Sequence, residues 1–206
     1  IAEPSNPWVA GEANLFTREQ FSLYARHLKP RGLVLQWVQC YEFNQRMLKR
    51  VFRTFHASFR HASLWHATES DLMLMGAQHP VTLDAARMRR RLAHSAVQKN
   101  LAKLRWPVDT RAPLFLLSRQ LLSENGFARR FGSREGLLSE RQPWLEFEAA
   151  RALFVGASPQ QFLQQIDQRL RGGEHLLLTI VHLLTKKQPP ELDDQNRPKL
   201  FFGETV

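Results

Sequence analysis

The sequence predicts an α/β fold at the start of the chain, followed by a mostly α-helical extension. Runs rich in β-branched and aromatic residues alternate with helical runs over residues 1–78, which is typical of a sheet covered by helices. After Pro80 the strand signals cease, and every later segment of any length has helical spacing. We therefore expect an α/β region at 1–78, a helical extension at 79–188 and an exposed tail at 189–206 that is rich in proline and polar residues.

The first predicted helix and the first predicted strand have clear local signals. Thr17 and Gln20 form a capping box before an apolar stripe, which predicts a helix from about Thr17 to Leu28. The run from Leu33 to Gln39 is almost continuously apolar, and it predicts a central parallel strand that is covered on both faces.

A second helix and a hairpin complete the first region. Asn44 is the expected N-cap of a helix that ends near Ser58, because apolar residues recur there at spacings of one, three and four. The runs Ala62 to His66 and Leu72 to Gly76 are short and strand-like, and a polar turn separates them. The simplest pairing for these two strands is an antiparallel hairpin at the end of the region.

Four helices are expected in the extension, at residues 82–104, 113–123, 158–171 and 174–187. The first ends before Trp106-Pro107, since proline cannot continue a helix. Its buried side is predicted to carry Leu83, Ala86, Leu92, Ala96, Leu101 and Leu104.

The composition is that of a globular protein. Of the 206 residues, 43% are hydrophobic and 23% are charged, which excludes disorder over most of the length. The most apolar run, Leu176 to Leu184, is too short to cross a membrane. The single cysteine, Cys40, excludes an internal disulfide and a multi-thiolate metal site, and it fits a reducing compartment. We expect a protein without a bound metal in the cytoplasm, free or attached to the inner face of a membrane.

The positive charge is unevenly distributed. The formal net charge is +10, and most of the excess lies between His79 and Arg130. Such a stretch can attract phosphate backbones or anionic lipid, or it can be a solvated helix face whose partners lie elsewhere in the fold.

The opening stretch, residues 1–16, has the composition of a functional loop. Loops at the carboxyl ends of parallel strands border the crevice of an α/β sheet, so Glu3, Ser5 and Asn6 are expected to project into a pocket. Pro4 and Pro7 would stiffen this loop. Glu3 is a candidate general base or cation anchor, and the alternative is a carboxylate that caps the following helix.

These residues resemble the spermidine synthase family of polyamine aminopropyltransferases, in particular its divergent bacterial members, which are often fused to membrane domains. The resemblance covers about the first 78 residues, and it recurs weakly from Leu137 to Phe147. It rests on an acid followed by small residues and a proline, then on a loop that leads to Leu-Phe, and on the elements that follow. The matching residues are Glu3, Pro4, Ser5, Asn6, Pro7, Gly11, Leu15, Phe16, Lys29 to Gly32, Gln36, Leu72 to Gly76, Pro143, Leu145, Glu146 and Phe147.

The resemblance implies a fold and a reaction. The fold would be the C-terminal half of a Rossmann-like sheet of the S-adenosylmethionine-dependent methyltransferase type. The reaction would be aminopropyl transfer from decarboxylated S-adenosylmethionine to an amine in polyamine biosynthesis. Glu3 stands at the position of the acid that deprotonates the amine, and Ser5, Asn6 and Gln36 would line the amine site. For Gln36, a buried amide bonded to the neighbouring backbone is an equal alternative.

The resemblance also implies partners. Asn6 stands where the family has a second acid, and the family's glycine-rich nucleotide loop would lie upstream of Ile1. We therefore expect this chain to bind no cofactor alone, with decarboxylated S-adenosylmethionine or S-adenosylmethionine as co-substrate once the upstream half or a companion subunit is present. A homo-oligomer and a membrane-associated assembly are further expectations.

Two other functions remain open from the sequence. One is a non-catalytic subunit that keeps a degenerate aminopropyltransferase fold and docks on a partner protein or an anionic surface. The other is a methyltransferase of the same fold. Binding of nucleic acid is not expected, because only the basic stretch supports it.

Overall fold

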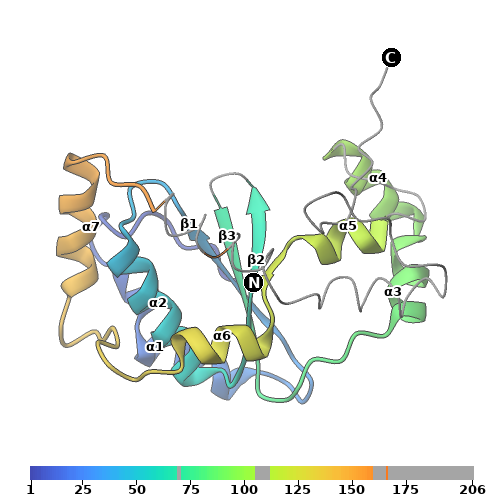
Figure 1. The fold of residues 1–206 in the computed structure, drawn as a ribbon, viewed down its shortest axis with the longest axis horizontal. Helices are drawn as coiled ribbons and strands as arrows, with labels where there is room; N and C mark the ends of the chain where they lie inside the picture. Colours follow the sequence, from blue (N-terminus) through green and yellow to red (C-terminus); the bar gives the residue numbers. More distant parts are fainter. Residues whose placement is uncertain (69–70, 105–111, 160–165, 167–206) are drawn as a thin grey trace, which may run out of the picture. The chain divides into compact units, whose positions relative to one another are not determined.

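The computed structural model describes residues 1–68, 71–104, 112–159 and 166, and it has a mixed α/β architecture (Figure 1). Two compact units are present. One contains Ile1–Thr82 together with Arg119–Ile166, and the described helices of the other lie within Leu83–Ser118. The sequence predicts that residues 119–159 belong to the helical extension, whereas in the structure they pack with the first 82 residues.

The first unit is built around one four-stranded sheet. Its strands are β1 (Val34–Gln39), β2 (His61–Thr68), β3 (Asp71–Ala77) and β4 (Gln120–Leu122), in the order β1-β3-β2-β4. All three pairings between these strands are antiparallel, and β2 and β3 form the predicted hairpin.

Strand β4 corrects the prediction that strand signals cease after Pro80. The segment 113–123 was expected to be one helix, but the helix α5 covers only Ala112–Ser118 and the chain then enters β4. Leu122 pairs with Leu64 of β2. A three-residue strand is too short to show a period of two, and its pairing depends on the edge of β2 that it joins.

The prediction that β1 is a central parallel strand is wrong, because β1 stands at the end of the strand order and its one strand partner is antiparallel. On one side it pairs antiparallel with β3. On the other side Gln36 forms a parallel bridge with Ala2. The Ala2 N–H donates to the Leu35 carbonyl at 2.8 Å, and the Trp37 N–H donates to the Ala2 carbonyl at 3.0 Å.

Two capped helices follow the predicted boundaries closely. Helix α1 spans Arg18–His27 after a short 3₁₀ helix, η1 (Glu12–Phe16), and the Thr17 hydroxyl accepts the Gln20 N–H at 3.4 Å. Helix α2 spans Gln45–Ser58, and the Asn44 side chain accepts the Met47 N–H at 2.9 Å. Both are side-chain N-caps of the expected kind.

The core of this unit is aromatic and lies between the sheet and α2. Phe52, Phe55 and Phe59 are fully buried, and the rings of Phe21 and Phe55 meet edge to face at 5.1 Å between centroids. Gly76 of β3 is required here, because a Cβ at this position would lie 2.7 Å from both Phe55 and Phe59. The absence of a side chain on Gly76 therefore lets α2 approach the sheet closely.

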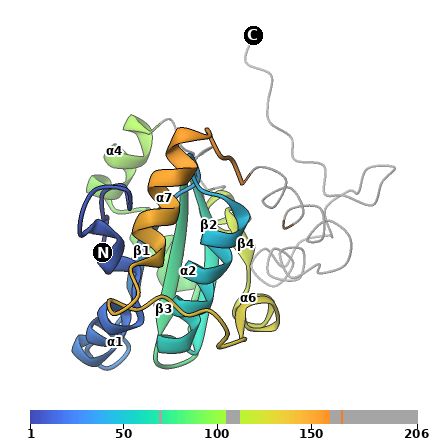
Figure 2. The same ribbon diagram turned by 90° about the vertical axis from the view of Figure 1, so that its left-hand side faces the viewer.

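Two later helices belong to the same unit. Helix α6 (Glu124–Phe131) adds Phe127 and Phe131 to the aromatic core. Helix α7 (Trp144–Phe154) lies beside α2 in both ribbon views (Figures 1 and 2). The loop between α6 and α7 runs along α1 and α2, and its contacts shape a pocket described below.

The second unit is helical where it is described. The predicted single helix at 82–104 is wrong, because the structure has two helices there, α3 (Ala85–Leu92) and α4 (Ser95–Lys103). The chain is extended at His94, with φ −65° and ψ 130°. Helix α3 has no buried residue, so packing does not extend it, and its closely spaced arginines repel one another.

The predicted buried side of this segment is also largely wrong. Leu101 is buried, whereas Leu83 and Leu104 are 45% and 60% exposed. The helices expected at 158–171 and 174–187 and the tail at 189–206 lie outside the described residues, apart from Ser158, Pro159 and Ile166. In the described part of the chain, no helix has the length and apolarity needed to span a bilayer.

Candidate functional site

The opening loop and the end of β1 meet at one edge of the sheet. Because Ala2 runs parallel to β1, the chain leaves this bridge in the same direction as it leaves Gln39. The segments Glu3–Pro7 and Cys40–Glu42 therefore emerge together, at the position where α/β sheets carry their functional loops. We call this region the loop edge.

The opening loop is fixed by its own contacts. Pro4 and Pro7 are buried, and the Ser5 N–H donates to the Glu12 carboxylate at 3.0 Å. Glu3 and Ser5 themselves are exposed. The alternative role for Glu3, a cap of the following helix, is carried by Thr17 instead.

Asn6 connects the loop to the end of β1. Its side-chain carbonyl accepts the hydroxyl of Tyr41 at 3.1 Å. The Tyr41 ring meets the Trp8 ring edge to face, with centroids 6.3 Å apart. Asn6, Trp8 and Tyr41 thus form an aromatic and polar cluster that joins the opening loop to the end of β1. Trp8 and Tyr41 were not singled out from the sequence, because their proximity depends on the parallel bridge of Ala2.

Gln36 lies deeper than the loop. It is fully buried, and its amide nitrogen donates to the carbonyl of Trp37 at 3.2 Å. Gln36 is on the same sheet face as Val34, and this face packs against α2, because Val34 is paired with Gly76. Within the described residues its side-chain oxygen has no hydrogen-bond partner. Gln36 thus makes the backbone contact expected of a structural amide and retains one acceptor.

Gln39 is a buried amide that the sequence analysis did not select. It ends β1 on the face opposite Gln36, is 1% exposed, and both of its amide atoms lack a partner among the described residues. Unpaired buried amides are costly, by about 1–3 kcal/mol each. The sequence feature that could have identified Gln39 is that it is a second glutamine in an otherwise apolar strand.

Asp71 adds negative charge to the loop edge. It begins β3 directly opposite Gln39 in the register. Burial and then the Asp71 carboxylate raise the pKa of Tyr41, with a further contribution from Glu42. Burial and Asp71 likewise raise the pKa of the Cys40 thiol to about 12, so Cys40 is not a nucleophile at neutral pH.

The loop edge is acidic in a strongly basic chain. Residues 1–17, residues 39–44 and Asp71 include no lysine or arginine, although the formal net charge of the protein is +10. Within the described part of the chain, the basic side chain that hydrogen bonds place at this end of the sheet is that of Arg119, which donates to the carbonyls of His66 and Ala67 in β2. These segments carry Glu3, Glu12, Glu42 and Asp71. An acidic edge lined by two aromatic rings is suited to a cationic ligand.

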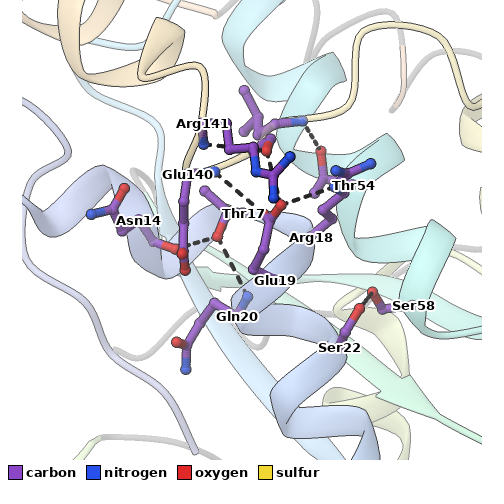
Figure 3. A network of polar contacts seen from close by, with 12 residues as sticks. Asn14, Thr17, Arg18, Glu19, Gln20, Ser22, Thr54, Ser58, Glu140 and Arg141 are labelled. Atoms are coloured by element: carbon purple, nitrogen blue, oxygen red, sulfur yellow. Dashed lines mark hydrogen bonds and ion pairs between the residues drawn. The ribbon is translucent and has the colours of Figure 1, made fainter.

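The later segment that resembles the family is held against α1 and leads into α7, whose Glu148 accepts the side-chain amide of Asn44 at 2.9 Å. Glu19 of α1 accepts the Ser139 hydroxyl at 2.8 Å and the Glu140 N–H at 3.3 Å, which clamps this segment to α1 (Figure 3). Burial alone would raise the pKa of Glu19, but hydrogen bonds from Arg18, Ser139 and the backbone outweigh it and lower the pKa to about 2.

Comparison of the chain with protein-family models, with curated proteins and with solved structures gives no match. Among the residues that the structure describes, no three His, Cys, Asp or Glu side chains are grouped as a metal ion would require.

Proposed function

We propose that this chain forms the amine-binding part of a spermidine synthase-like transferase. The strand order supports the proposal. Strands β1 and β2 are both antiparallel to β3, so they run parallel to each other, and α2 connects them. Together with the parallel bridge of Ala2, this is the arrangement expected of the C-terminal half of a Rossmann-like sheet of the methyltransferase type.

The observation that carries the proposal is the acidic and aromatic character of the loop edge. The substrate implied by the resemblance is an ammonium ion, which is attracted by carboxylates and by aromatic faces. Asn6 replaces an acid at this edge, but Asp71 supplies a carboxylate from β3 close to Tyr41. The edge therefore keeps a second negative charge besides Glu3.

The chemistry assigned to Glu3 follows from the pKa of an alkylamine, which is about 10. Such an amine must lose a proton before it can attack carbon. In the proposed step the nitrogen lone pair forms a C–N bond to the aminopropyl carbon attached to the sulfonium. The C–S bond breaks, its electron pair goes to sulfur to give a neutral thioether, and the proton from nitrogen passes to Glu3.

The neighbouring side chains would position the amine. Asn6 is held by Tyr41, so its amide has a fixed orientation. Ser5 lies between Glu3 and Asn6 in the loop, and Gln39 offers unpartnered amide atoms at the end of β1. Gln36, which the resemblance assigns to the amine site, lies on the other face of the sheet, so it would act from the core side. Gln39 is closer to the end of β1 than Gln36, and we add it to the proposed amine site.

The test is an assay of the natively purified protein with decarboxylated S-adenosylmethionine and putrescine, with the products identified by mass spectrometry. Glu3→Gln should reduce transfer by at least about a hundredfold, which is the usual contribution of a positioned base. Glu140→Gln is the matched control, because it removes an exposed carboxylate from the segment clamped to α1 and should leave the rate unchanged.

The products also separate the alternatives. A methylated amine formed from S-adenosylmethionine would replace the aminopropyl assignment with a methyltransferase. Equal turnover by Glu3→Gln and the unmodified protein would remove Glu3 as the base. No product from either donor would favour the non-catalytic subunit.

A further inference from the structure

A basic pocket lies on α2, on residues other than those of the loop edge. It has a volume of about 390 Å³. Four of its lining residues are cationic, and two belong to the loop between α6 and α7. The lining residues are Gln45, Arg46, Lys49, Arg50, Arg53, Glu135 and Gly136.

Neutral groups hold the arginines of the basic pocket in place. The Arg50 Nε donates to the carbonyl of Gly136 at 2.6 Å, and an Arg53 terminal nitrogen donates to the carbonyl of Glu135 at 3.4 Å. The guanidinium of Arg50 also lies 4.0 Å from the centre of the Trp144 ring, and that of Arg46 lies 5.2 Å from it. Carbonyls and an indole orient these cations without cancelling their charge.

The cations in the basic pocket also repel one another. Burial and the neighbouring charge of Arg46 lower the pKa of Arg50. The Nε of Arg53 is buried and has no hydrogen-bond partner among the described residues. An anion in the basic pocket would relieve the repulsion and would bring acceptors to a site that is rich in donors.

The pocket wall is fixed before any ligand binds. The Thr54 hydroxyl accepts the Leu138 N–H at 2.9 Å, and Glu19 holds the next two residues of the same loop (Figure 3). These contacts position the carbonyls of Glu135 and Gly136 that orient the arginines. A preorganised set of donors loses little conformational entropy on binding.

We propose that the basic pocket binds the phosphoryl group of a phosphate monoester or diphosphate. Guanidinium groups match the oxygens of phosphate with paired hydrogen bonds, and Lys49 adds a further charge. Three arginines and one lysine outnumber the one acidic residue of the lining, Glu135, so the pocket suits a dianion better than a single carboxylate. The pocket is compact, so the ligand is a small phosphorylated molecule or the headgroup of a phospholipid.

The test is isothermal titration calorimetry of the 206-residue chain with pyrophosphate. The salt concentration is about 150 mM, at which nonspecific attraction of the anion to exposed charges is screened. Arg50→Gln and Lys49→Gln should each weaken binding by about tenfold or more, as the loss of a charged hydrogen bond predicts. Arg50→Lys should have an intermediate effect, because lysine keeps the charge but cannot form the paired hydrogen bonds of a guanidinium group. Circular dichroism of each variant separates loss of binding from loss of folding.

The matched control is Arg87→Gln, which removes the same charge from helix α3 in the other unit and should leave pyrophosphate binding unchanged. Equal losses in Arg87→Gln and Arg50→Gln would overturn the proposal, since they would indicate a general effect of net charge. Failure of pyrophosphate to bind, together with failure of the vesicles described next, would also overturn it.

A second arm distinguishes the two sources of the phosphoryl group. Phosphatidylcholine vesicles with and without a phosphatidylinositol monophosphate are sedimented with the protein and with the same variants. Binding of the phosphoinositide vesicles that is lost in Lys49→Gln assigns the pocket to a headgroup. Pyrophosphate binding without vesicle binding assigns it to a soluble ligand.

Discussion

The Thr54 hydroxyl accepts the backbone N–H of Leu138 at 2.9 Å, although 84 residues separate the two in the sequence. The same hydroxyl donates to the carbonyl of Arg50 one turn earlier in α2, at 2.6 Å. Thr54 is fully buried and Leu138 is 2% exposed. One side chain in the middle of α2 therefore satisfies a buried donor of the loop that forms the wall of the basic pocket.

Replacement of Thr54 by Val should destabilise the protein. Valine has nearly the same shape, but it leaves the Leu138 N–H without a partner in a buried position, which costs about 1–3 kcal/mol. Urea unfolding followed by circular dichroism measures this loss directly. The same variant should weaken pyrophosphate binding, because the carbonyls that orient Arg50 and Arg53 lose their support.

Thr54→Ser is the control for the hydroxyl. Serine keeps the group that accepts from Leu138 and removes only a methyl group, so most of the stability lost in Thr54→Val should be retained. If both variants lose the same free energy of unfolding, the methyl group and not the hydrogen bond stabilises this contact.

Gly136→Ala should affect both the stability and the basic pocket. Gly136 has φ +65°, which disfavours any residue with a Cβ, and an added Cβ would lie 3.2 Å from the Nε of Arg50. We expect a loss of about 1 kcal/mol from the backbone and weaker pyrophosphate binding from the displaced guanidinium.

Gly156→Ala separates these two effects. Gly156 has a similar φ of +59°, but an added Cβ would meet no atom within 4 Å. It should lower the stability by a similar amount and leave the binding of pyrophosphate unchanged. Equal binding by the two alanine variants would show that the Arg50 contact is not important for the pocket.

The elements that the sequence predicted well are those with local signals. Thr17 and Asn44 cap α1 and α2 through hydrogen bonds to residues three positions away, so the cause of each helix start lies within a few residues. The β2–β3 hairpin is equally local. The strand β4 depends instead on pairing with a strand more than 50 residues earlier, and no local pattern marks it.

The candidate site shows the same division. The opening loop with Glu3 and Asn6 could be selected from its composition. Tyr41 and Asp71 could not, because one is placed by the parallel bridge of Ala2 and the other by the register of β3 against β1. The basic pocket forms only because the loop at Gly136 packs against α2. The hydrogen bond that joins them, from Arg50 to Gly136, links residues 86 positions apart in the sequence.

Glu19 should make the stability depend on pH in the acidic range. Its pKa falls from an ordinary value of 4.5 to about 2 in the folded protein, so the folded state favours the ionised form. This contribution is complete above about pH 5, and it is lost as the pH falls toward 2. Urea unfolding at several acidic pH values should show a weaker dependence in Glu19→Gln than in the unmodified protein. Identical slopes would contradict the contribution of the Ser139 and Glu140 contacts.

Protonation of His56 should destabilise the fold, at pH values above the range in which Glu19 titrates. Burial and the charge of Arg134 lower its pKa below the ordinary 6.5, and its ring stacks on Phe127 with centroids 6.0 Å apart. The unfolded chain therefore takes up a proton before the folded one, and stability falls as the pH drops below about 6.5. His56→Phe should remove this part of the dependence, whereas His79→Asn, at an exposed position, should retain it. A full dependence in His56→Phe would assign it to another group.

Cys40 should be almost unreactive in the folded protein. Burial, aided by Asp71, raises the pKa of its thiol from 9.0 to about 12, which leaves about a thousandfold less thiolate at neutral pH. Alkylation by iodoacetamide, followed by mass spectrometry, should therefore be slow in buffer and rapid in urea. Asp71→Asn removes only the smaller of the two causes, so alkylation of that variant should remain slow. Rapid labelling of the Asp71→Asn variant would show that the charge at the loop edge, and not burial, protects the thiol.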